Sequence, residues 1–325
     1  MKIANKAFFP LDKRWQLDRS RFSYGLSREL VWLGGLLPFE SASLAFERFT
    51  GYAVPQTTLW EQAKRHGERL HAYEEQRREQ VNIERLQWNH QDYDPLAYRS
   101  VSMDGGMIHI RQEGWKEMKV GLVSGLQHEW EREKPRTRLV HLDYTAVIGT
   151  VETFAPALWE LSVRNEIPYA GRTAVVADGA AWIWRLCADY FPGSTQIVDW
   201  YHARQQLAHA AELRHPDNDV GAQRWYEKMS PHLFHGEVWK IIHDLKQHDI
   251  SATYFQTHQR RMQYLRFRAD GFPIGSGGVE SGIKQYKQRL SGPGMRWSRQ
   301  GAERMLTIRT AVLARHFDDL WEQAA

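Results

Sequence analysis

The chain has 325 residues, a length that predicts roughly two domains at about 150 residues per domain. Its 42% hydrophobic and 25% charged residues are ordinary values for a globular protein and exclude a disordered chain. The net charge is +4, no stretch approaches the ~18 consecutive apolar residues of a membrane span, and the N-terminal region lacks the apolar segment of a secretory signal, so we expect a cytoplasmic protein without a membrane partner.

The first hundred residues carry helical patterns. Three helices are predicted over about 27–37, 40–51 and 55–80, with Gly51 ending the second and Pro55 beginning the third. Residues 90–99 follow Asn89 and contain Asp92, Asp94 and Pro95, residue types that are typical of a linker. These features predict a helical N-terminal domain over residues 1–95.

Strand patterns begin at residue 100. Residues 100–106 alternate apolar and polar side chains, and we expect this strand to end at Asp104, before two glycines. Further strands are predicted over 107–112, 115–125 and 138–149, and a helix over 154–166 follows. A buried strand at 173–180 ends at Asp178, and a helix then leads to a short strand at 195–201. The pattern indicates an α/β domain with a mixed sheet.

From residue 202 to about 270 every pattern is helical, which predicts an all-helical insertion in the α/β domain. A glycine-rich loop at 273–278 and helices over 279–290 and 298–317 follow. The predicted domains are therefore 1–95, a first core segment at 96–201, the insertion at 202–270 and a last core segment at 271–325.

The single cysteine, Cys187, excludes an internal disulfide and every multi-cysteine zinc site. It lies in AWIWRLCADYF, an apolar helical pattern, so we expect a small buried core residue.

Charge is unevenly distributed along the chain. Residues 101–200 hold ten Lys or Arg against thirteen Asp or Glu, whereas residues 281–310 hold seven Lys or Arg against one Glu. An acidic middle beside a basic end suits a protein that holds cations and binds a polyanion, although solvated helix faces give the same composition.

Three acids stand out by their positions. Asp104 and Asp178 each come at the predicted end of a strand and precede glycine, and Glu280 opens a helix after the glycine-rich loop. Ligands bind at strand ends in α/β sheets, and a divalent metal is one reason to keep carboxylates there. Asp-Gly is also ordinary turn chemistry, so each acid alone is weak support for catalysis.

Four segments carry a further pattern: SMDGG, VVADGAAWIW, VDWYHA and IGSGGVESGIKQYKQRLSGPGMRW. Together they resemble the ISKra family of bacterial insertion-sequence transposases, which is similar in its core to the Mutator-like transposases. The resemblance extends from FFPLD near the N-terminus to about Leu313, and GSGxVES followed by GMxW is its most specific part.

The resemblance implies a ribonuclease H-like fold with an Asp-Asp-Glu triad at Asp104, Asp178 and Glu280. These acids would hold two Mg²⁺ or Mn²⁺ ions for phosphodiester cleavage. The helical stretch 202–270 resembles the insertion domain that such transposases carry before the Glu.

Asp199 and His202 match the family's D-x-x-H pattern. His202 is a candidate catalytic residue that orients a phosphate or leaving group near the metals. The alternative is structural, with Asp199 capping a helix and His202 held by hydrogen bonds.

Basic residues after Glu280 are candidate DNA contacts, because Lys and Arg bind phosphates without regard to sequence. Positions 280, 284 and 287 share one helical face. Trp297 could stack on an unpaired base or pack under its glycine-rich turn. The candidates are Lys284, Lys287, Arg289, Arg296 and Trp297.

The segment ASLAFERFTGYAVPQTTLWEQAKR has the rhythm of a helix-turn-helix. Its second helix would read a DNA groove or contact phosphates, and a helical dimerisation element is the alternative. The candidate DNA-binding residues here are Gln56, Thr57, Thr58, Lys64 and Arg65.

The sequence thus predicts a bacterial, nucleoid-associated DNA transposase, working as a homodimer, that cleaves the ends of its element and joins them to target DNA. Both steps would be in-line phosphoryl displacements. The alternative is a transposon-derived sequence-specific DNA-binding protein that lacks strand-transfer activity.

Overall fold

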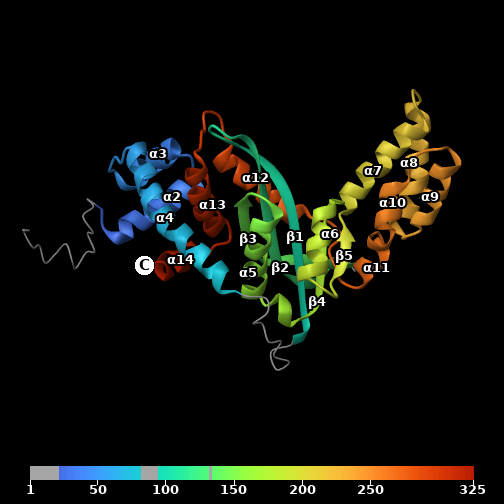
Figure 1. The fold of residues 1–325 in the computed structure, drawn as a ribbon, viewed down its shortest axis with the longest axis horizontal. Helices are drawn as coiled ribbons and strands as arrows, with labels where there is room; N and C mark the ends of the chain where they lie inside the picture. Colours follow the sequence, from blue (N-terminus) through green and yellow to red (C-terminus); the bar gives the residue numbers. More distant parts are fainter. Residues whose placement is uncertain (1–21, 82–93, 132–133) are drawn as a thin grey trace, which may run out of the picture. The chain divides into compact units, whose positions relative to one another are not determined.

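The structure, a computed structural model, describes residues 22–81, 94–131 and 134–325, so the FFPLD segment at 8–12 lies outside the described residues. The chain divides into two compact units. Unit 1 contains the described residues up to 77 together with 109–115 and 286–325, and unit 2 contains the described residues among 78–108 and 116–285. Figure 1 labels the helices and strands of both units.

Unit 1 is built on five helices among the described residues. They are α2 (Tyr24–Leu36), α3 (Phe39–Thr50), α4 (Gln56–Gln80), α13 (Arg299–Leu313) and α14 (Phe317–Gln323). The three N-terminal helices confirm the predicted helical patterns. Gly51 ends α3 with φ 76°, a left-handed conformation that glycine adopts without strain, and its N–H donates to the carbonyl of Glu47 at 2.8 Å.

Two buried arginines hold the end of α2 in unit 1. Arg289 Nε donates to the carbonyl of Gly34 at 2.7 Å, and Arg309 Nη1 donates to the carbonyls of Gly35 and Leu36, both at 3.3 Å. The last carbonyls of a helix have no partner within it, and cations are favourable at this end. The arginines therefore satisfy groups that would otherwise be buried without hydrogen bonds.

Glycine lets α2 approach α13 closely. A Cβ at Gly35 would lie 2.6 Å from Cγ2 of Ile308, closer than real Cβ atoms come. The absence of this side chain allows α13 to pack directly on the backbone of α2, which brings Arg309 within reach of the α2 carbonyls.

Unit 2 contains a five-stranded mixed sheet in the order β3-β2-β1-β4-β5. β2 pairs antiparallel with β3, whereas β1 pairs parallel with β4 and β4 pairs parallel with β5. The strands are β1 (Asp94–Ile110), β2 (Gly114–Glu131), β3 (Lys134–Ile148), β4 (Ala170–Ala177) and β5 (Thr195–Val198). The mixed α/β architecture matches the predicted class.

β1 corrects two predictions made from the sequence. The strand begins at Asp94, inside the predicted linker, and it continues past Asp104 to Ile110 instead of ending at the glycines. A Cβ at Gly105 would lie 2.5 Å from Oε1 of Glu117, on β2. The glycine therefore makes room for a neighbouring side chain within a continuous strand and does not form a turn.

Helices cover the sheet of unit 2 and extend from it. The segments between the strands from β3 to β5 form α5 (Val151–Arg164), a 3-10 turn (Ile167–Tyr169) and α6 (Ala181–Tyr190). Residues 200–269, all of them described, contain no strand; their helices are α7 (Trp200–Arg214), α8 (Asp219–Phe234), α9 (Val238–Gln247), α10 (Thr253–His258), a 3-10 turn (Gln259–Arg261) and α11 (Tyr264–Ala269). Their helical character confirms the periodicity of the predicted insertion.

One continuous core joins these helices to the sheet. Buried side chains of the strands, such as Val101 and Val176, belong to the same hydrophobic cluster as Leu207 of α7, Phe255 of α10 and Phe267 of α11. The helical stretch therefore packs as part of unit 2.

α12 (Gly277–Leu290) follows the glycine-rich loop and leads from unit 2 into unit 1. The two units group residues 286–325 with the N-terminal helices, whereas the predicted division gave 271–325 to the sheet domain. The packing of Arg289 and Arg309 on α2 accounts for this grouping. The four-part functional division stays a prediction. Within the described ranges, helices with the length and apolar character of a membrane span are absent.

The buried cysteine gives a test of the fold. Cys187 is 0% exposed, and burial raises the pKa of its thiol to about 12. At pH 8 this pKa leaves about a thousandfold less thiolate than an ordinary cysteine with a pKa of about 8.5 has. We expect Ellman's reagent to leave Cys187 unmodified in the folded protein and to modify it fully in guanidinium. A Cys187→Ala chain carrying Ser291→Cys, at an exposed position, should react at once. Equal rates for the two proteins would contradict the described packing of α6.

Candidate functional site

Two of the predicted acids lie side by side because of strand pairing. β1 and β4 are parallel, and Met103 pairs with Ala177, so Asp104 continues β1 where Asp178 comes directly after the end of β4. Both carboxylates are half-buried. Asp178 accepts a hydrogen bond from the N–H of Ala180 at 2.9 Å, which orders the turn into α6.

Glu280 lies in the first turn of α12, in the region where the N–H groups of a helix favour negative charge. Its side chain is half-buried. The hydroxyl of Ser276, in the loop before the helix, lies 3.4 Å from Glu280 Oε1.

Asp199 connects the beginning of α7 to the loop before α12. Its side chain caps α7 by accepting a hydrogen bond from the N–H of His202 at 2.8 Å. Its second oxygen accepts from the N–H of Ser276 at 2.6 Å and from the Ser276 hydroxyl at 2.9 Å. Asp199 is completely buried, so these bonds compensate a carboxylate that would otherwise be costly to bury.

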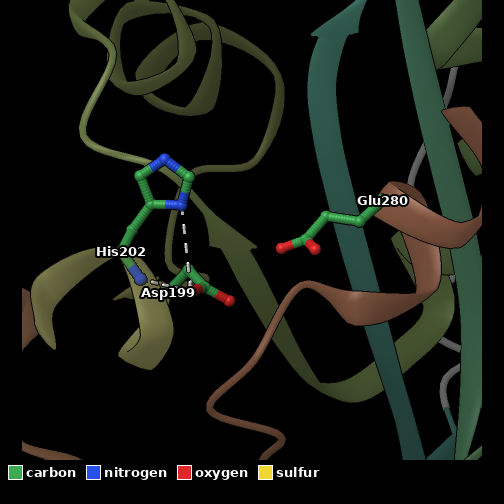
Figure 2. A group of neighbouring side chains, drawn as sticks. All are labelled: Asp199, His202 and Glu280. Carbon is green, nitrogen blue, oxygen red and sulfur yellow. Dashed lines mark hydrogen bonds and ion pairs between the residues drawn. The ribbon is translucent and has the colours of Figure 1, made fainter. Parts of the chain in front are cut away.

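This connection brings His202 and Glu280 to the same place (Figure 2). One ligand atom from each of Asp199, His202 and Glu280 lies within 4.8 Å of the other two. Figure 2 shows the Glu280 carboxylate extending from its helix toward the other two side chains. Carboxylate oxygens with an imidazole nitrogen form a donor set for a divalent metal. Within the described residues, Asp104 and Asp178 are not part of a group with this spacing.

The hydrogen bonds of Asp199 restrict its use as a metal ligand. A carboxylate oxygen accepts about two hydrogen bonds, and Oδ2 already accepts two from Ser276. Oδ1 accepts one from His202 and lies 4.0 Å from Nδ1 of the same residue. Asp199 therefore serves first as a cap and a connection, which agrees with the structural alternative for this residue.

The pKa of Asp104 depends on its burial and on other charged groups of the site. Burial is the largest cause that raises its pKa, and the N–H of Gly105, at 2.6 Å, opposes that effect. The negative charges of Asp178 and Glu280 raise the pKa further, while His202 lowers it. Asp178, Glu280 and His202 therefore lie near enough to Asp104 for their charges to affect its pKa.

Two aromatic side chains that the sequence does not indicate, Tyr254 and His258, lie beside Asp178. A Cβ at Gly179 would lie 2.6 Å from Tyr254 and 3.3 Å from Nε2 of His258, both on α10. Burial, and then the charges of Asp178 and Asp199, raise the pKa of Tyr254, whereas burial and Arg261 lower the pKa of His258. Both groups are therefore neutral at pH 7. No local pattern marks them, because they reach the site only through the packing of the helical stretch on the sheet.

The predicted DNA-binding residues divide by exposure. The exposed side chains are Gln56, Thr57, Lys64, Arg65, Lys284, Lys287 and Arg296, and Thr58 is half-buried. Two others are buried: Arg289 is 2% exposed and Trp297 is 9% exposed. Trp297 Nε1 donates to the carbonyl of Leu290 at 2.9 Å, which fits the packing alternative for this residue. Arg289 packs inside unit 1, so it does not lie on the open surface as the exposed candidates do.

Comparison with known proteins finds a distant relative. No family model matches the chain. The chain is 24% identical over 329 positions to the UPF0236 protein in vanSb 3′ region of Streptococcus gallolyticus, with 95% of this chain and 68% of the relative covered. Among solved structures, the Drosophila P element transposase strand transfer complex aligns with 12% identity over 97% of this chain and 84% of that one. Its TM-score of 0.30 does not indicate a shared fold.

The Asp199 connection gives a stability test. Asp199→Ala removes a helix cap and leaves the N–H and hydroxyl of Ser276 without their acceptor, so we expect a loss of about 3 kcal/mol in the free energy of unfolding. Asn218→Ala removes only the exposed cap of α8, a bond of 2.9 Å to the N–H of Gly221, and should cost about 1 kcal/mol. Urea unfolding measures both losses. Equal losses would contradict a stabilising connection between α7 and the loop before α12.

Proposed function

We propose that this chain is a metal-dependent DNA transposase of the Asp-Asp-Glu type, related to the ISKra family, that acts on the ends of its own insertion sequence. The observation that carries the proposal is the strand register that pairs Met103 with Ala177, the residues directly before Asp104 and Asp178, together with the effect of the Asp178 and Glu280 charges on Asp104. The four sequence segments quoted above agree with it, because each acid falls within one of them. The five-stranded mixed sheet is compatible with a ribonuclease H-like core.

The donor set suits the divalent ions that the proposal requires. Several carboxylates near one imidazole match the oxygen-rich coordination of Mg²⁺ and Mn²⁺. Burial raises the pKa of Asp104 most, and the negative charges of Asp178 and Glu280 raise it further; a bound cation would offset both effects. Asp104, Asp178 and Glu280 would hold two such ions. When bound, the ions supply charge stabilisation to phosphodiester cleavage and strand transfer.

The chain's own residues supply positioning. Asp199 and Ser276 fix the loop before α12 and so hold Glu280 in place. His202, in the first turn of α7, lies beside Glu280, where its imidazole would bind a phosphate oxygen. Lys284 lies four residues after Glu280 on the same helix, so it would bind the DNA backbone next to the acids.

A second function has one observation in its favour. Asp104 and Asp178 do not share the close ligand spacing of Asp199, His202 and Glu280. A DNA-binding protein derived from a transposon, without strand transfer, needs no such spacing. The two functions differ in whether the protein cuts DNA.

Substitution of the acids separates the two functions. Asp104→Asn and Glu280→Gln keep side-chain size but remove the charge that holds a metal. We expect cleavage of a plasmid carrying the gene with its genomic flanks, in Mg²⁺, to fall about a thousandfold or more, because metal stabilisation supplies several kcal/mol. Gel-shift affinity for fragments of the same plasmid should stay nearly unchanged.

Matched controls are Asp189→Asn and Glu79→Gln, both at exposed helix positions. They should cut as the unmodified protein does. Full cleavage by both Asp104→Asn and Glu280→Gln would exclude the triad as the catalytic site. DNA binding without cleavage by the unmodified protein would favour the second function.

The two sets of DNA-binding candidates should differ in their effect. Gln56→Ala and Thr58→Ala should each cost about 1–3 kcal/mol of discrimination between element ends and random DNA, because base edges carry sequence. Lys284→Ala and Lys287→Ala should weaken binding to all sequences alike and flatten the salt dependence. Competition binding at two salt concentrations measures both effects.

Unchanged specificity after the N-terminal substitutions would exclude groove reading by α4. Sedimentation of the same variants then tests dimerisation, the alternative for residues 40–66. A normal dimer with normal specificity would contradict both roles.

A further inference from the structure

Unit 1 contains a cavity of about 570 Å³ that the proposed cleavage chemistry does not use. Its walls come from the beginnings of α3, α4 and α13 and from the turn at 293–298. Among its lining residues are Phe39, Gln56, Trp60, Arg289, Arg296 and Trp297. This volume lies within the range of about 300–1,000 Å³ typical of sites for small organic ligands.

The charges on the walls favour an anion. Lys64, Arg111, Arg289, Arg296 and Arg304 line the cavity, and Glu40 is the acidic residue among the lining side chains. Arg304 also forms an ion pair with Glu68 at 3.1 Å, so its charge is partly compensated. The remaining excess of positive charge suits a phosphate group.

Arg289 supplies a buried donor in this wall. Its Nε donates to Gly34, whereas its Nη2 is buried and has no hydrogen-bond partner in the described structure. Burial, and then the neighbouring Arg309, lower its pKa to about 10, which keeps it charged at neutral pH. A buried charged donor without an acceptor is costly, and a bound phosphate oxygen would satisfy it.

The beginning of α13 adds main-chain donors. Ser298 caps this 15-residue helix by accepting from the N–H of Gly301 at 3.2 Å, and Ser298, Gln300 and Gly301 all line the cavity. The first turn of a helix presents N–H groups and a partial positive charge to an anion. Together with the spare donor of Arg289, the helix start forms a phosphate-binding wall.

An aromatic wall accompanies the cationic one. Trp60 is 47% exposed, and Lys64 Nζ lies 5.4 Å from the centre of its ring. Trp297 and Phe39 lie deeper, with the guanidinium of Arg289 5.2 Å and 4.6 Å from their ring centres. An exposed indole beside cations stacks well on a nucleobase, because every base has a flat face.

We propose that this cavity binds one unpaired nucleotide of a DNA strand, with its phosphate on Arg289 and the beginning of α13 and its base on Trp60. The inference rests on the proposed function, because it names a feature of the DNA that the transposase would hold. Gln56, Lys64 and Arg296 then line one nucleotide site, although they come from distant parts of the sequence.

Binding of two duplexes to the full-length protein in EDTA tests the inference. The duplexes share one sequence, and one of them carries a single unpaired 2-aminopurine nucleotide at its 3′ end. Fluorescence anisotropy should give an affinity about 5- to 150-fold higher for the duplex with the unpaired nucleotide, since stacking of one base contributes about 1–3 kcal/mol. The 2-aminopurine emission should be quenched on binding.

Trp60→Ala should abolish both the preference and the quenching, and Trp60→Phe should retain most of them. Trp239→Ala is the matched control, because Trp239 is 62% exposed on α9 and also lies beside a lysine, with Lys240 Nζ 5.7 Å from its ring centre. It should leave both unchanged. Circular dichroism confirms that the variants are folded.

The outcomes distinguish the inference from the proposed function. Equal affinity for the two duplexes would overturn the nucleotide site and leave the transposase proposal standing. Failure to bind either duplex would overturn both. Micromolar binding of free thymidine monophosphate that Trp60→Ala removes, without any preference for the unpaired duplex, would replace the DNA strand with a free nucleotide and so overturn the inference.

Discussion

The carboxylate of Asp199 accepts hydrogen bonds from two segments, the beginning of α7 and the loop before α12, where Ser276 lies 77 positions after Asp199. It has no exposure to solvent, so its charge depends on these bonds. The same bonds fix the beginning of α7, which carries His202, and the loop before α12, which carries Glu280. A site that must hold two groups at fixed distance gains from a rigid buried connection, because loops alone leave such groups mobile. The chemistry we propose for Glu280 therefore depends on a residue that is itself hardly available to a metal.

The helical stretch 200–269 contributes side chains both to the core of unit 2 and to the surroundings of Asp178. Its core is continuous with that of the sheet, and α10 places Tyr254 and His258 against the Gly179 backbone, next to Asp178. The environment lowers the tendency of both groups to carry charge. Tyr254 and His258 are therefore neutral neighbours that do not compensate the charge of Asp178. That charge raises the pKa of Asp104.

Unit 1 uses buried charge in a different way. Arg289 and Arg309 satisfy the last carbonyls of α2, and Arg289 also lies over the rings of Phe39 and Trp297. A guanidinium can bond through Nε and still present its other nitrogens elsewhere, because its donors form a fixed planar fork. Arg289 therefore completes the helix packing and also lines the cavity, while its Nη2 has no hydrogen-bond partner in the described structure.

The sequence by itself determined the helices, most of the strands, the helical stretch and the burial of Cys187, because these depend on residues a few positions apart. It singled out Asp104, Asp178 and Glu280 as candidates and placed Asp104 at a strand end, whereas β1 continues to Ile110 and Glu117 lies against Gly105. Only the tertiary structure decided that Arg289 is buried, that Asp199 is bonded to Ser276 and that Tyr254 lies beside Asp178. Burial and hydrogen bonding between distant segments follow from packing, which local periodicity does not encode.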